Sequence, residues 1–221
     1  MDEQAVFAQL KKQKKAVLLD YLKAAFQEMN PQQRRAVFAD VLQQPAKKTV
    51  DGDQLRQEID EFRSDSLARR YYAPFNVNYK NFMERPEKTR QWCDLFARFV
   101  ADASKLTVGN NHAQAVACFA ILYEVLVALE SGKEIIFAEE AGSWMIPAKE
   151  KDWLEAYLTS LAATATPEAF TAVALPMIKR DSFHSFASRV YLSATKVANP
   201  QQKIHLQVEV RQQKIRTAAT S

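Results

Sequence analysis

Glycine is scarce in this sequence, with four glycines among 221 residues. The average usage of about 7% would give roughly fifteen. Because β-sheets and tight hairpins need glycine at their turns, this scarcity favours helices that are joined by short loops. We therefore expect an all-α protein.

The sequence motifs of the common enzyme classes are also missing. There is no glycine-rich phosphate loop, no GxSxG nucleophile motif and no HExxH zinc motif. The two cysteines, Cys93 and Cys118, are too few for a disulfide framework and are not at zinc-ligand spacing. We expect both to be reduced thiols in the core, and we expect no metal and no cofactor. These absences favour a protein that is not an enzyme, but an enzyme with dispersed catalytic residues stays open.

Long hydrophobic runs are absent as well. The N-terminus has no apolar stretch of signal-peptide length. The longest apolar run, Ala115 to Leu129, is interrupted by Glu124 and is too short to cross a membrane comfortably. We interpret 111–131 as a central buried helix. The expected location is the cytoplasm, without a membrane partner.

What the chain does have is helical periodicity along most of its length, beginning with one pattern over 3–28. Helices are predicted to open on a proline that follows a capping residue, at Pro31, Pro167 and Pro200. Pro167 and Pro200 lie 33 residues apart, a spacing typical of helical-hairpin repeats. We expect stacked antiparallel helix pairs, either α-solenoid-like (a helical repeat) or an orthogonal helical bundle.

The polar segment 43–53 is the best linker in the sequence. It predicts an N-terminal helical hairpin at 1–44 and a main repeat-like domain at 51–221, with one continuous domain as the alternative. Two stretches of the last third are ambiguous. Pro176 should kink or split its helix, and 204–210 alternates like a strand although its apolar residues also fit a helix, which we favour.

The strongest candidate for binding is the segment 63–90, where aromatic and basic residues alternate. Its candidate contact residues are Arg69, Arg70, Tyr71, Tyr72, Phe75, Tyr79, Lys80 and Phe82. Tyrosine and arginine are favoured anchors of protein interfaces, and the same side chains can stack on bases and contact phosphates. The alternative is structural, with the aromatic rings tethering a long loop to the helical core.

A second set of residues offers polar groups for a small-ligand pocket. These residues are His112, Glu124, Glu139, Glu140 and Trp144. On a helix, Glu139 and Glu140 project about 100° apart, so they do not converge as a catalytic pair must. We interpret their segment as a helix end terminated by Gly142. Glu124, alone in an apolar helix, must either find a basic partner or face solvent.

The formal net charge of +4 is unevenly distributed. Residues 176–221 carry eight Lys or Arg and two Asp or Glu, a balance of +6, which leaves −2 for the first 175 residues. A basic end can meet an acidic protein or a nucleic acid. The residues expected to contact a nucleic acid are Lys203, Arg211, Lys214 and Arg216.

Together these patterns predict a non-enzymatic helical-repeat protein that acts as a protein–protein interaction or assembly module and has a protein partner. The first alternative is a nucleic-acid-binding protein that uses the basic C-terminal third or segment 63–90. The second alternative is a small-ligand binder or enzyme with a pocket between helices.

Overall fold

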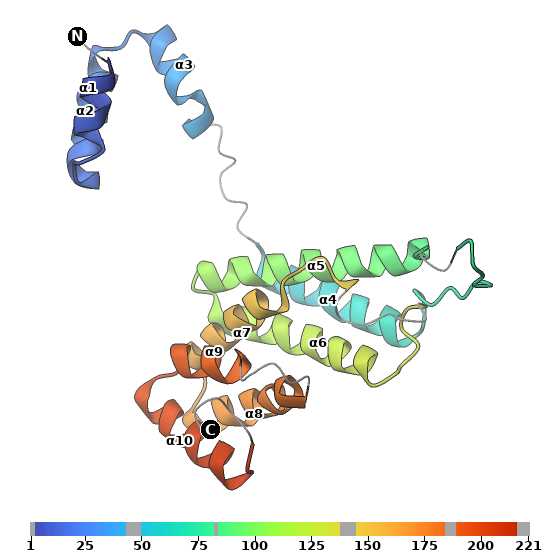
Figure 1. Ribbon diagram of the computed structural model, residues 1–221. Helices are drawn as coiled ribbons and strands as arrows, with labels where there is room; N and C mark the ends of the chain where they lie inside the picture. Colours follow the sequence, from blue (N-terminus) through green and yellow to red (C-terminus); the bar gives the residue numbers. More distant parts are fainter. Residues whose placement is uncertain (1–2, 43–49, 82–83, 138–144, 184–188, 216–221) are drawn as a thin grey trace. The chain divides into compact units, whose positions relative to one another are not determined.

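The protein is described by a computed structural model that covers 3–42, 50–81, 84–137, 145–183 and 189–215. These residues form ten α-helices and no strand, which confirms the expected all-α class (Figure 1). The chain divides into two compact units, Met1–Thr49 and Val50–Ser221. The helices of each unit pack on their own neighbours.

The N-terminal unit contains α1 (Glu3–Leu10), α2 (Lys15–Glu28) and α3 (Pro31–Leu42). The expectation of one helix over 3–28 is therefore wrong. Lys14 has extended backbone angles (φ −70°, ψ 149°) and ends the first helix pattern. The intervening residues are lysines and one glutamine, which bring no apolar side chain that would hold a continuous helix against a neighbour.

The turn between α2 and α3 is fixed by local hydrogen bonds. Asn30 Oδ1 accepts from the backbone N–H of Gln33, and Gln33 Oε1 accepts from the backbone N–H of Asn30, both at 2.9 Å. This reciprocal pair is a capping box, and Pro31 occupies the first helical position. Arg34 donates to the carbonyl oxygens of Phe26 and Gln27 and so satisfies the end of α2.

The first half of the main unit is a bundle around α6. Its helices are α4 (Gly52–Leu67), α5 (Glu87–Val108), α6 (His112–Glu130) and α7 (Glu150–Thr164). α6 packs against the other three. By length and composition it is the one helix of the described chain that could cross a membrane. The core helix of a folded domain meets the same criterion, and α6 buries Cys118, Phe119 and Leu122 in the centre of this bundle.

The second half of the main unit adds α8 (Pro167–Phe183), α9 (Arg189–Val197) and α10 (Pro200–Gln212). α7 packs on α9, and α8 packs on α10. The hairpins α7–α8 and α9–α10 therefore lie side by side, first helix on first and second helix on second (Figure 1).

Both ambiguous stretches of the last third are helical. α10 includes 204–210, which confirms the helix interpretation. α8 runs through Pro176 without a break, so the helix is not split there. Pro176 and Ala172 are both exposed, and water can therefore satisfy the carbonyl group that loses its hydrogen bond to the proline nitrogen.

The start of α10 is tied to the end of α7. Asn199 and Gln202 form a second capping box, with both hydrogen bonds at 2.9 Å. The buried Gln202 side chain also donates from Nε2 to the carbonyl oxygens of Ala162 (3.1 Å) and Ala165 (2.9 Å). Gln202 thus caps its own helix and also satisfies two carbonyl groups at the end of α7.

Candidate interaction surfaces and the polar clusters

Most aromatic side chains of the connection between α4 and α5 point into the protein. The Tyr71 ring lies 5.7 Å from the Phe62 ring, and the rings of Tyr72 and Phe75 lie 5.8 and 5.4 Å from the Phe137 ring. Burial raises the pKa of the Tyr71 phenol. These three rings hold the long connection against α4 and the segment after α6.

The two arginines of this segment form ion pairs inside the main unit. Arg69 pairs with Glu134, and Arg70 Nη1 lies 3.0 Å from Asp65 Oδ1. Arg69 has a left-handed backbone (φ 61°) directly after the C-cap of α4, Ala68. The side chains are largely exposed, so these pairs contribute little stability, but they orient the start of the connection.

The tip of the connection presents two further candidates, Tyr79 and Lys80, to solvent. Tyr79 is 81% exposed, and Lys80 Nζ lies 5.6 Å from the centre of its ring. Asn81 braces the turn, because its Oδ1 accepts from the N–H of Asn78 (2.6 Å) and its Nδ2 donates to the carbonyl of Asn76 (3.0 Å). Tyr79 and Lys80 are both exposed, and Phe82 lies outside the described residues.

Of the five predicted pocket residues, the structure describes Glu124 and His112, and these two lie far apart. Glu124 is on the exposed side of α6, where its Oε2 lies 3.2 Å from Arg63 Nη1, so this lone carboxylate both faces solvent and has a basic partner. His112, twelve residues earlier on the same helix, is about 18 Å away along the helix axis. Glu139, Glu140 and Trp144 lie outside the described residues.

His112 instead belongs to a polar contact between α5, α6 and α7. Its Nδ1 lies 3.1 Å from Ser160 Oγ, which lies 2.8 Å from Thr107 Oγ1. Ser160 is fully buried, and these two hydrogen bonds satisfy its hydroxyl group. The arrangement is that of a structural polar contact between helices rather than of a nucleophile with its base, because no orienting carboxylate faces the imidazole among these contacts.

Open grooves lie on the surface of the described part of the chain. One groove of about 230 Å³ lies between α4 and α6, with Leu67, Val127 and Glu124 in its wall. The described residues contain no group of three or more His, Cys, Asp or Glu that could hold a metal ion. The groove between α4 and α6 is open to solvent, unlike the enclosed pockets that bury most of a small ligand.

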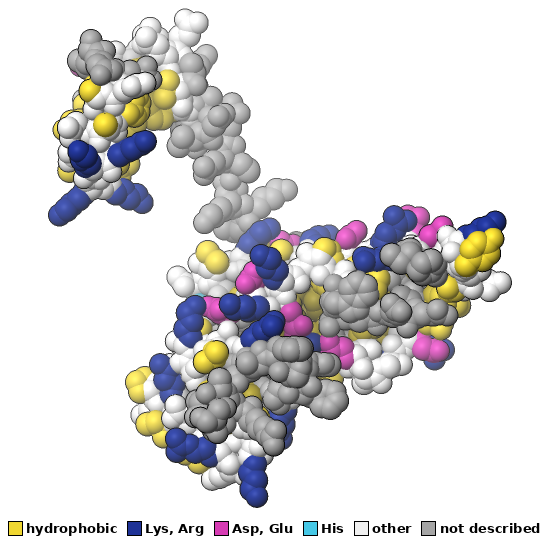
Figure 2. All heavy atoms as spheres, in the orientation of Figure 1, with side chains coloured by type: hydrophobic (Ala, Val, Ile, Leu, Met, Phe, Trp, Pro, Cys, Tyr) yellow, Lys and Arg dark blue, Asp and Glu magenta, His cyan; other side chains and the backbone are white. Residues whose placement is uncertain are grey.

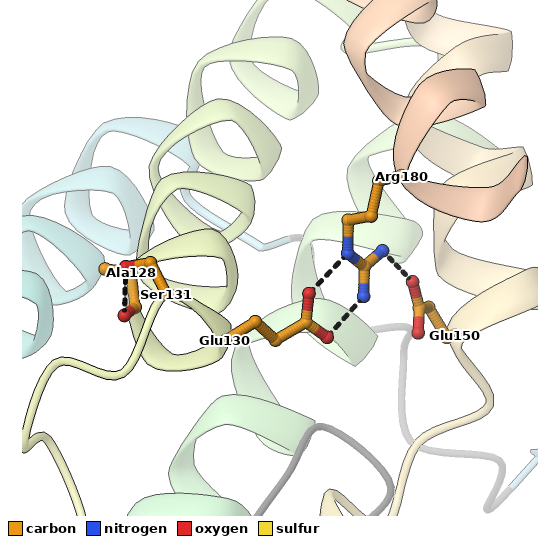
Figure 3. Close-up of polar contacts among 5 residues, drawn as sticks. All are labelled: Ala128, Glu130, Ser131, Glu150 and Arg180. Atoms are coloured by element: carbon orange, nitrogen blue, oxygen red, sulfur yellow. Dashed lines mark hydrogen bonds and ion pairs between the residues drawn. The ribbon is translucent and has the colours of Figure 1, made fainter. Parts of the chain in front are cut away.

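The best-buried charge cluster was not predicted from the sequence (Figure 3). Arg180 of α8 donates from Nε and Nη2 to the two carboxylate oxygens of Glu130, at 2.5 and 2.6 Å, and from Nη1 to Glu150. Its side chain is 15% exposed. Burial lowers the pKa of Arg180, but the hydrogen bonds and charges of both glutamates outweigh this and raise its pKa.

This cluster joins the end of α6, the start of α7 and the last third of α8. Arg180 also lies 6.0 Å from the centre of the Tyr123 ring. The bidentate geometry fixes the guanidinium group in one orientation. We interpret the cluster as the clamp that fixes α8 to the α6–α7 pair.

The N-terminal unit exposes an unusual share of large hydrophobic side chains. They are Val6, Phe7, Leu19, Tyr21, Leu22, Phe26 and Val37. No residue of α2 is buried. Figure 2 shows hydrophobic side chains at the surface of this unit, beside several Lys or Arg side chains. One contact inside the unit is aromatic, between the rings of Phe26 and Phe38 at 5.2 Å.

The C-terminal end of the main unit is basic, and Figure 2 shows Lys and Arg gathered over the part formed by α8, α9 and α10. Lys203, Arg211 and Lys214 form no ion pair with the described residues, and Arg216 lies outside them. On the same helix, Ile204 and Val208 are exposed one turn apart. This face therefore combines positive charge with apolar surface.

Comparisons of the chain with protein-family models, curated proteins and solved structures found no match. Function must then be argued from this chain's own surfaces. The two that most need explanation are the exposed hydrophobic side chains of the N-terminal unit and the apolar, basic end of the main unit.

Proposed function

We propose that the protein is a non-enzymatic helical-repeat module that binds or assembles with other proteins. The observation that carries this proposal is the N-terminal unit, which exposes seven large hydrophobic side chains and contains a helix, α2, without a buried residue. A protein partner that covers these side chains would supply the missing core. A cytoplasmic location is part of the proposal.

The physical reason is that the N-terminal helices are too short to be stable alone. α1, α2 and α3 have 8, 14 and 12 residues. Isolated helices shorter than about 12–15 residues are marginal in water. Both cysteines lie outside this unit. Covering one exposed Leu or Phe side chain would contribute about 1.5–3 kcal/mol.

The main unit supports a scaffold role in a second way. The hairpins α7–α8 and α9–α10 pack first helix on first and second on second, and each second helix opens on a proline, Pro167 or Pro200. Stacked hairpins of this kind form extended surfaces rather than enclosed pockets. The braced tip with Tyr79 adds a candidate anchor on this scaffold.

The test is affinity capture from the native lysate after nuclease treatment, with the full chain as bait. The informative variant is Leu22→Glu, which places a charge on the apolar face of α2. Gln27→Glu is the matched control, because Gln27 is exposed about 140° around the same helix. We expect the wild type and Gln27→Glu to retain the same protein and Leu22→Glu to lose at least tenfold of it. Equal capture by all three baits would refute the proposal.

A second candidate function, nucleic-acid binding, is favoured by the unpaired cations of α10 and the turn that follows it. Lys203, Arg211 and Lys214 would neutralise about three phosphates, so affinity for duplex DNA should fall about forty-fold for a fourfold rise in salt. Fluorescence anisotropy of a labelled duplex measures this slope, and replacement of all three residues by Gln should flatten it. Absence of binding in dilute buffer would exclude this candidate.

A further inference from the structure

Helix α2 carries a continuous stripe of exposed apolar side chains. Leu19, Leu22 and Phe26 follow the i, i+3, i+7 spacing and therefore lie within about 60° of the helix circumference. They are 52%, 49% and 40% exposed, respectively. An amphipathic helix uses this spacing when it enters an apolar groove or pairs with a second helix. We call these three residues the α2 stripe.

The side chains that border the α2 stripe are positively charged. Lys15 lies in line with the stripe, one turn before Leu19, and Lys23 lies beside it. Arg34 of α3 places its guanidinium group 4.7 Å from the centre of the Phe26 ring. None of the ion pairs among the described residues involves Lys15, Lys23 or Arg34. The border of the stripe therefore presents positive charge that the chain itself does not neutralise.

The acidic side chains of α2 lie away from the stripe. Asp20 and Glu28 project about 130° and about 150° from the middle of the stripe around the helix axis. Both are exposed. The charges of α2 are thus sorted, with cations around the apolar residues and carboxylates behind them. A partner surface that surrounds an apolar centre with carboxylates is complementary to this arrangement.

The start of α2 also lacks the negative charge that a helix N-terminus favours. Lys14 at the N-cap receives no side-chain hydrogen bond from the helix, and the first turn contains no acidic residue. The helix dipole places partial positive charge at this end, so Lys14 and Lys15 are unfavourable there. The starts of α3 and α4, in contrast, are capped by Asn30 and Asp51. A carboxylate from a partner would offset the positive charge at the start of α2.

We infer that the α2 stripe binds an amphipathic helix of a partner protein, and that Asp and Glu side chains border the apolar face of that helix. This inference rests on the proposed function and names the chemistry of the partner. The stripe packs between the apolar side chains of the partner helix, and the flanking carboxylates face Lys15 and Lys23. The apolar contact supplies affinity, and the charges select the partner.

The probe is a synthetic helical peptide with Leu at the a and d positions of its heptads and Glu at the e and g positions. Repulsion between the glutamates opposes pairing of this peptide with itself. The charge control is a second peptide in which Lys replaces each of these glutamates. Fluorescence anisotropy of each labelled peptide, titrated with the full chain, measures the dissociation constants. We expect the wild type to bind the Glu peptide at least tenfold more tightly than the Lys peptide.

Three variants locate the binding site on α2. Leu22→Glu interrupts the stripe and should lose at least tenfold in affinity for the Glu peptide. The double variant Lys15→Glu/Lys23→Glu keeps the stripe and should reverse the preference, so that the Lys peptide binds more tightly. Ala24→Glu is the matched control and should bind as the wild type does, because Ala24 is exposed about 160° around the helix from Leu22. Circular dichroism of each variant verifies that the helix content is unchanged.

The outcomes separate this inference from the proposed function. Equal affinity for the two peptides, binding of neither, or binding that Leu22→Glu retains overturns the inference. The proposed function fails separately, when lysate capture is the same for the wild type and for Leu22→Glu.

Two other occupants of the stripe have their own readouts, each taken where the Glu peptide does not bind. Self-association of the chain in light scattering, lost in Leu22→Glu, would assign the stripe to a second copy. Binding to phosphatidylserine vesicles, lost in the same variant, would assign it to a membrane surface. Either result overturns the inference.

Discussion

The helices α2 and α5 have the same kind of sequence and opposite surroundings. Both repeat apolar residues at helical spacing. On α5, Trp92, Phe96 and Phe99 are buried against α4, α6 and α7, whereas on α2 even Tyr21 and Leu22 are about half exposed. The pattern thus states which face of a helix requires a neighbour and does not state which neighbour covers it. The apolar face of α5 is covered within the main unit, whereas α2 has no buried residue.

The largest effect should come from removing an aromatic side chain from the covered region. Trp92 is fully buried, its ring lies 5.4 Å from that of Phe96, and its Nε1 donates to Ser66 Oγ at 2.8 Å. Trp92→Ala should lower the free energy of unfolding by about 3–5 kcal/mol. Urea unfolding followed by circular dichroism measures this loss.

The matched change in the uncovered region is Phe7→Ala on α1, where the ring is more than half exposed. It should change the free energy of unfolding of the isolated chain by at most about 0.5 kcal/mol. A loss comparable to that of Trp92→Ala would show that the N-terminal unit has a core of its own. The contrast between the two units would then be broken.

The next largest effect should come from the clamp on α8. Arg180→Met leaves Glu130 and Glu150 without their shared cation, and removing one partner of a buried ion pair costs about 3–5 kcal/mol. Because Glu150 is 39% exposed, we expect about 3 kcal/mol. The control is Lys105→Met, which breaks a surface pair with Asp102 and should cost less than about 1 kcal/mol. Equal losses in the two variants would mean that the clamp does not hold α8.

The stability of the main unit should depend on pH through its two buried thiols. Burial raises the pKa of Cys93 and of Cys118 to about 11, and both lie in the main unit. In the unfolded chain a thiol titrates at about 8.5. Between these values the folded state binds more protons than the unfolded state, so stability falls as the pH rises from about 9 to about 11.

The check compares urea midpoints at about pH 8 and about pH 10.5 for the wild type and the Cys93→Ala/Cys118→Ala variant. The wild type should lose more of its midpoint than the variant over this interval. Titration of lysines and tyrosines affects both proteins alike, so only the difference between them reports the thiols. Parallel losses would show that the thiols are not desolvated in the folded chain.

Local chemistry made much of the fold predictable from the sequence. Asparagine followed by proline marks the start of α3 and of α10 because both residues act within one helical turn. The core helix α6 was predictable from its largely apolar composition. The surroundings of Glu124 were predictable from the cost of burying an unpaired carboxylate.

The side-chain contacts that could not be predicted from the sequence join residues that are far apart in the chain. Arg180 meets Glu130 and Glu150 from two other helices, and no spacing in the sequence connects these three positions. The ion pair between Arg69 and Glu134 could not be predicted either, because the two residues are 65 positions apart in the sequence. The candidate binding residues, chosen from composition alone, therefore include side chains engaged inside the main unit, such as Tyr71 and Arg69, as well as exposed ones, such as Tyr79.

The smallest effect on stability should come from Glu124→Gln, because Glu124 lies on the solvent-exposed side of α6. The carboxylate pairs with Arg63, but Arg63 Nη2 also lies 3.0 Å from Asp60 Oδ1, so the guanidinium keeps a partner when Glu124 is neutralised. The free energy of unfolding should change by at most about 0.5 kcal/mol, measured by urea unfolding. Lysate capture should also be unchanged, because the proposed partner surfaces lie elsewhere. A variant that stays folded but loses a bound ligand would instead assign function to the groove between α4 and α6, where Glu124 is the carboxylate beside Leu67 and Val127.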